Sequence, residues 1–102
     1  MSFNVVASKT ASISTNVLTL ASTLFNFASS DLTGAQKVTL LASTASLYIN
    51  WSTVNPSTTL GSGVPVTTGV AYSLTGALNV AQLKMIAQTT AAAGSVLAIL
   101  EK

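Results

Sequence analysis

Short segments rich in Thr, Val, Ile and aromatic residues recur along the whole chain, and clusters of Gly, Pro, Asn and Ser separate them. β-Branched and aromatic residues suit the pleated, half-buried surface of a strand, and the separating residues are those that form turns. Short strands at such close spacing are typical of sandwiches and barrels. The sequence therefore predicts an all-β fold, either a single small β-sandwich or a jelly-roll-like barrel with an N-terminal extension.

The clearest strand pattern covers residues 45–53. Leu47, Ile49 and Trp51 alternate there with Tyr48 and with polar residues. Because successive side chains of a strand point to opposite faces, we expect the first three in the core. Tyr48 should lie on the other face, where its hydroxyl can reach water or a neighbouring group.

Other segments carry weaker strand patterns. We expect strands at 36–42, 64–67, 70–75 and 95–101, and a short strand or an extended arm at 1–7. Residues 12–27 and 79–89 satisfy both helical and strand spacing, so the pattern does not decide between the two. The low helix propensity of Ser, Thr and Asn favours one or two strands with a bend at 12–27.

No shift of composition marks an internal boundary. We therefore expect residues 1–30 to form N-terminal strands or an arm packed on the same domain, and residues 31–102 to form the sandwich core. Residues 54–69 hold both prolines and three of the six glycines, which predicts a long loop. Loops of this length in compact domains often carry function.

The chain is nearly devoid of reactive side chains. It contains no His, Cys or Arg, and Asp31 and Glu101 are its only side-chain carboxylates. Acid–base catalysis, nucleophile activation and metal binding all require clusters of such groups. We therefore expect no enzymatic activity, no catalytic residues, no metal and no cofactor.

Charge is equally sparse. Charged residues make up 6% of the chain, and its net charge of +2 comes from four separated lysines. Nucleic-acid binding needs a clustered basic face, so no nucleic-acid partner is expected. Soluble surfaces usually carry about 25–35% charged residues. Either Ser, Thr and Asn provide the polar coat of an ordinary soluble domain, or other subunits cover much of the surface, and we favour the second interpretation.

The positive mean hydropathy of +0.62 raises the question of a membrane. The two most apolar stretches are 11–28, which Ser, Thr and Asn interrupt, and 91–100, which is too short for a span of about 20 residues. We expect neither a membrane span nor a cleaved signal. A small membrane protein remains the weaker alternative.

A series of turn and strand motifs in residues 31–101 resembles a known group of proteins. The series runs through Asp31-Leu32-Thr33-Gly34-Ala35-Gln36, Leu47-Tyr48-Ile49-Asn50-Trp51, Asn55-Pro56-Ser57, Gly61-Ser62-Gly63-Val64-Pro65-Val66 and Gly69-Val70-Ala71-Tyr72-Ser73-Leu74-Thr75-Gly76. It then continues through Asn79-Val80 and Leu83-Lys84-Met85-Ile86-Ala87 to a closing apolar strand. This order resembles the small β-sandwich virion proteins of tailed bacteriophages, which carry no catalytic residues.

The resemblance implies a capsid decoration, or cement, subunit that stabilises the phage head by bridging capsid proteins. Its partners would be the major capsid protein or other virion subunits, together with further copies of itself, with a trimer as the implied homo-oligomer. It would lie on the capsid surface of the virion, after residing in the host cytoplasm during assembly. A tail or fibre-base component is the nearest alternative within the same group.

Aromatic residues and the long loop supply the candidate partner contacts. These are Phe25, Phe27, Tyr48, Asn55, Pro56 and Tyr72. Of the two phenylalanines, we expect one in the core and one at an interface. A carbohydrate- or receptor-binding module is a further alternative, with the loop Asn55–Gly69 and either tyrosine as its site.

Overall fold

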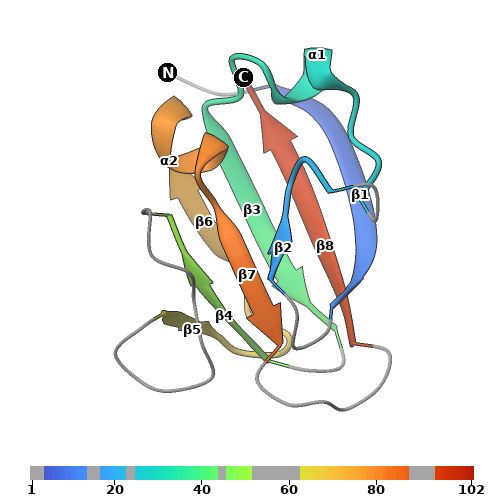
Figure 1. Ribbon diagram of the computed structural model, residues 1–102, viewed down its shortest axis with the longest axis vertical. Helices are drawn as coiled ribbons and strands as arrows, with labels where there is room; N and C mark the ends of the chain where they lie inside the picture. Colours follow the sequence, from blue (N-terminus) through green and yellow to red (C-terminus); the bar gives the residue numbers. More distant parts are fainter. Residues whose placement is uncertain (1–3, 14–16, 23–24, 44–45, 52–62, 88–93) are drawn as a thin grey trace.

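Two antiparallel sheets form the molecule. The computed structural model describes residues 4–13, 17–22, 25–43, 46–51, 63–87 and 94–102. Within them, one sheet has the order β1 (Val5–Ile13), β8 (Gly94–Glu101), β3 (Lys37–Ala42) and β6 (Tyr72–Thr75). The other has the order β2 (Leu18–Thr19), β7 (Lys84–Ala87), β4 (Leu47–Asn50) and β5 (Val64–Val66). The sheets stack as a sandwich (Figure 1), which confirms the all-β prediction.

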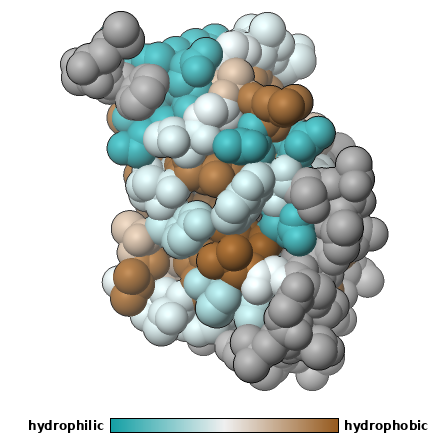
Figure 2. All heavy atoms as spheres, turned by 90° about the vertical axis from the view of Figure 1, so that its left-hand side faces the viewer, coloured by the Kyte–Doolittle hydropathy of each residue, from teal (hydrophilic) through white to brown (hydrophobic). Residues whose placement is uncertain are grey.

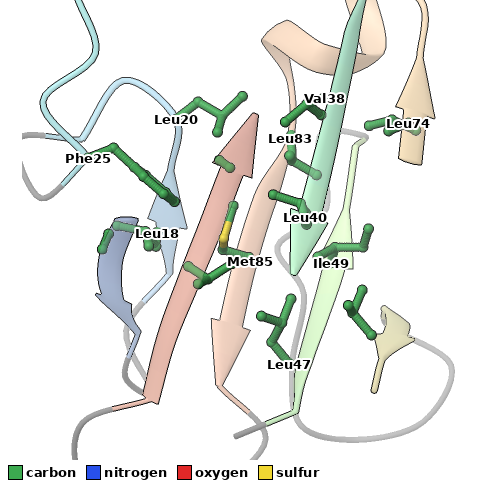
Figure 3. Packing of buried hydrophobic residues seen from close by; sticks show 14 of the residues in the cluster. Leu18, Leu20, Phe25, Val38, Leu40, Leu47, Ile49, Leu74, Leu83 and Met85 are labelled. Carbon is green, nitrogen blue, oxygen red and sulfur yellow. The ribbon is translucent and has the colours of Figure 1, made fainter. Parts of the chain in front are cut away.

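The core lies between the two sheets and follows from strand alternation. In β3, Val38 and Leu40 are fully buried, while Lys37 and Thr39 on the opposite face are partly exposed. Neighbouring β8 repeats the pattern, and β4 and β7 supply the facing layer, including Ile49 (Figure 3). Each large side chain removed from water in this layer contributes about 1.5–3 kcal/mol. The strand predicted at 36–42 is thereby confirmed.

In strand β4, the alternation of side chains correctly predicts which residues enter the core. Leu47 and Ile49 are in the core as expected, and Trp51, just past the strand, packs partly buried against it. Tyr48 lies on the opposite face, beside Ile86 of β7 and Pro65 of β5. Its side chain is nevertheless only 4% exposed. The outer face of this sheet therefore buries apolar side chains as well.

The N-terminal segments differ from the expectation in their boundaries. Of the short strand or arm expected at 1–7, Val5–Ala7 belong to a longer strand, because β1 continues to Ile13 along the length of β8. Residues 1–3 lie outside the described residues. Strand β8 is the apolar C-terminal strand, and β1 pairs with it along its eight residues by backbone hydrogen bonds. In the described part of 12–27, the end of β1 belongs to one sheet and β2 belongs to the other.

The segment 79–89, which fits both patterns, contains both structures. Helix α2 (Ala77–Ala81) ends just before β7 begins. Gly76 precedes the helix with a φ of 102°, a conformation open to glycine, and Val80 is the buried residue of the helix. Helix spacing governs the first part of the segment, and strand alternation of Leu83, Met85 and Ala87 governs the second.

The residues around Asp31, where the motif series begins, form a single helical turn, α1 (Ser29–Leu32). The Thr33 hydroxyl donates to the Ser29 carbonyl at 2.9 Å, and Lys102 Nζ donates to the Ser30 carbonyl at 2.8 Å. Both helices lie at the end of the sandwich where β1 begins and β8 ends (Figure 1). There, the backbone groups of Asn4 and Lys102 bond each other in both directions at 2.9 Å.

Candidate interaction surfaces

Phe25 and Phe27 form a stacked pair beside β2. Their ring centroids are 5.6 Å apart with planes inclined by 27°. Asn26 between them has a φ of 57°, a left-handed conformation that asparagine tolerates better than most residues. Phe25 is 1% exposed and Phe27 is partly buried against the core. The pair closes one side of the sandwich, and only Phe27 retains exposed area.

Tyr72 lies at the other side of the molecule, in β6. Its ring centroid is 6.5 Å from that of Trp51 at an angle of 32°. Because β6 belongs to one sheet and Trp51 follows β4 of the other, the pair spans the two layers at this edge. Both rings are partly buried, so each keeps a portion of its surface accessible.

The predicted contact residues therefore do not converge on one surface. Phe25 and Phe27 lie on the β2 side, Tyr72 lies on the β6 side, and Tyr48 is buried on the outer face of the second sheet. Asn55 and Pro56, together with most of the predicted loop, fall outside the described residues. The described edge at β5 (Val64–Val66) matches the short edge strand expected at 64–67.

A hollow of about 200 Å³ opens at the helical end. It is lined by Leu20 and Ala21 after β2, by Leu32 of α1, and by Val80 and Ala81 of α2. Ligand pockets are usually larger, about 300–1,000 Å³, and contain polar groups that fix orientation. All five lining residues have apolar side chains, and most of the lining surface is apolar. The hollow could accept an apolar side chain, but none of these five side chains could orient a polar ligand.

Sequence reasoning missed this hollow because its lining comes from three distant segments. No local pattern places Leu32 beside Val80. Sequence reasoning also missed the exposed apolar residues, of which Leu78 (69%), Val5 (62%) and Val70 (58%) are the most accessible. Hydropathy marks such residues as candidates for the core, and only the folded arrangement identifies them as surface residues.

The described surface is weakly polar rather than charged. Figure 2 looks onto the side where α2, β6 and β5 lie and shows separate hydrophobic patches among hydrophilic residues and residues of intermediate hydropathy. Hydroxyl pairs such as Thr39–Ser73 and Ser46–Thr68, each 3.1 Å apart, provide part of its polar structure. In the described part of the chain, no group of three His, Cys, Asp or Glu residues comes together.

Neither helix of the described chain has the length and apolar character needed to cross a membrane. Comparisons with protein-family models, with curated proteins and with solved structures found no match to this chain.

Proposed function

We propose that this protein is a non-enzymatic structural subunit of a tailed-phage virion, a decoration subunit that stabilises the head by bridging capsid proteins. Such a subunit acts by burying surface against its neighbours rather than by transforming a substrate. The proposal places it on the capsid surface, with the major capsid protein or other virion subunits as partners.

One observation carries the proposal, namely a surface that is almost uncharged and yet displays large apolar residues. With 6% charged residues, the chain has little like-charge repulsion to keep it apart from neighbours. Val5, Val70 and Leu78 are each more than half exposed, on different elements or loops. Depletion of charge is a feature of the buried centres of interfaces.

The distribution of these residues fits a bridging role better than a single binding site. Val5 lies in β1 at one edge of the first sheet, whereas Val70 precedes β6 at the opposite edge. A subunit that contacts several neighbours needs such separate contact areas, each of which can be modest. The resemblance of residues 31–101 to small virion proteins supports the same role.

Particles with and without the protein test the proposal. Purified virions should contain the chain in a fixed stoichiometric ratio to the major capsid protein, measured by quantitative mass spectrometry. Heads assembled without it should lose their DNA at lower temperature or in milder osmotic shock, and added purified protein should restore the resistance. Heads of unchanged robustness would rule out a cementing role, and density on the tail or fibre base would favour that alternative position.

The Trp51–Tyr72 pair supports a second candidate, a carbohydrate- or receptor-binding module. Partly exposed aromatic rings can serve as anchors at recognition surfaces. Because Trp51 is the only tryptophan, its fluorescence can be followed during titration with glycans. A saturable change that Tyr72→Ala removes would support this module, whereas an unchanged spectrum across a glycan panel would eliminate it. Tyr48, at 4% exposure, is not accessible for such a site.

A further inference from the structure

The four edge strands of the two sheets are unequal. Strand β2 has two residues, β5 has three with Pro65 in its middle, and β6 has four. Short edges and prolines are devices that prevent pairing with another strand. Strand β1 has nine residues and no proline, and it lies outermost in its sheet (Figure 1). Strand β1 is therefore the longest edge strand in the described part of the chain.

Only one side of β1 is paired within the described residues. Its register with β8 runs from Val5 opposite Glu101 to Ile13 opposite Gly94. The segment that follows β2 passes this side of the molecule, but its Phe25 and Asn26 amides bond the Ser22 carbonyl within the same segment. The backbone groups on the outer side of β1 therefore resemble the pairing edge that an incoming strand uses.

We propose that β1 pairs antiparallel with β1 of a second copy of this chain, about a twofold axis at Thr10. The ladder with β8 is irregular between Val5 and Ala7 and regular from Ala7 to Ile13. The midpoint of that regular part is Thr10. A twofold axis perpendicular to the sheet keeps both copies' faces aligned, so one residue faces itself and the others pair symmetrically around it.

The side chains of β1 suit this register. On the outer face, Thr10 would face Thr10 of the other copy, and Ser8 would face Ser12. All three are exposed and uncharged, and paired hydroxyl residues across strands are favourable. On the inner face, Lys9 would lie opposite Ala11 rather than opposite itself. A register centred on Lys9 would place two like charges directly across the seam, which disfavours pairing there.

The size of the seam sets the expected strength. The seven paired residues of β1 extend about 24 Å. A contact along one strand edge of this length buries far less than the roughly 800 Å² per partner of a stable complex. The pair should therefore be weak in dilute solution and favoured where neighbours hold two copies close together. The two Lys9 side chains would lie diagonally across the seam, so added salt should strengthen the association by screening them.

A cysteine scan tests the register, because the chain has no cysteine of its own. Residues that face each other across antiparallel strands lie within the range that a disulfide can bridge. Thr10→Cys should form intermolecular disulfides at least tenfold faster than Ser8→Cys, Ser12→Cys or the control Ser73→Cys on β6. A mixture of Ser8→Cys and Ser12→Cys chains should give the mixed disulfide. Equal rates for Thr10→Cys and Ser73→Cys would overturn the proposal, as would fastest self-linking at another β1 position.

Light scattering of the unmodified chain provides the second measurement. Its mass should rise with concentration and with salt, from 10.3 kDa towards twice that value. Ser8→Lys combined with Thr10→Lys should abolish the rise, whereas the matched pair Ser73→Lys with Thr75→Lys on β6 should not. A constant monomer mass would refute the proposal, and so would the threefold mass of the trimer that the resemblance implies. These measurements use the free chain, so their result is independent of any role in a virion.

Discussion

Replacing Leu40 by Ala is the sharpest test of the packing described above. Leu40 lies in the middle of β3, between Ala98 of β8 and Tyr72 of β6, and its side chain is 0% exposed. The substitution removes three buried carbon atoms, worth about 2.4 kcal/mol at about 0.8 kcal/mol each. The cavity left behind brings the expected loss of unfolding free energy to about 3–5 kcal/mol. The total unfolding free energy of a domain of this size is about 5–15 kcal/mol.

The matched control is Leu78→Ala. It deletes the same atoms from a side chain that is 69% exposed, so the unfolding free energy should change by no more than about 0.5 kcal/mol. Urea denaturation followed by the fluorescence of Trp51, which packs against the core, measures both variants. A loss of unfolding free energy below about 1 kcal/mol for Leu40→Ala, or equal losses for the two variants, would contradict the buried packing of Leu40. A changed denaturant slope would instead signal a departure from two-state unfolding.

Three further changes test individual structural features. Gly76→Ala should cost about 1–3 kcal/mol in chemical denaturation, because φ is 102° and a Cβ would lie 3.1 Å from Asn79 Nδ2; a neutral result would contradict this backbone geometry. Asn26→Val should cost about 1–2 kcal/mol at its φ of 57°, whereas Asn26→Gly should cost nothing measurable by the same assay; equal stability of the two would refute the left-handed assignment. Tyr72→Ala should shift Trp51 emission to longer wavelength because the neighbouring ring at 6.5 Å is lost, and an unshifted spectrum would argue against that contact.

Strand alternation made the fold class predictable. In β3, the difference between the buried Leu40 and the half-exposed Thr39 is encoded directly in their polarity. The same parity placed Tyr48 on the outer face of β4, but it could not predict that this side chain is buried. Burial there depends on what covers the sheet, which is a property of the whole fold rather than of neighbouring residues.

Segments that satisfy two periodicities were the least predictable. Around Val80 and Met85, the apolar residues fit a helix and a strand equally well, and the chain forms one after the other. Tertiary pairing decides the outcome, since β7 lies between β2 and β4 and completes their ladders. The hollow between α1 and α2 was beyond sequence reasoning for a similar reason, because its lining is brought together only by folding.

The neighbouring ends of β1 and β8 also determine how the molecule would respond to mechanical force. Tension applied between Asn4 and Lys102 would act perpendicular to β1 and β8. The hydrogen bonds between these two strands would therefore break one at a time from that end. Strands opened in this way resist far less than strands pulled along their length, where all the bonds must fail together. Under tension between these two residues, β1 would therefore be the first strand to separate from its sheet.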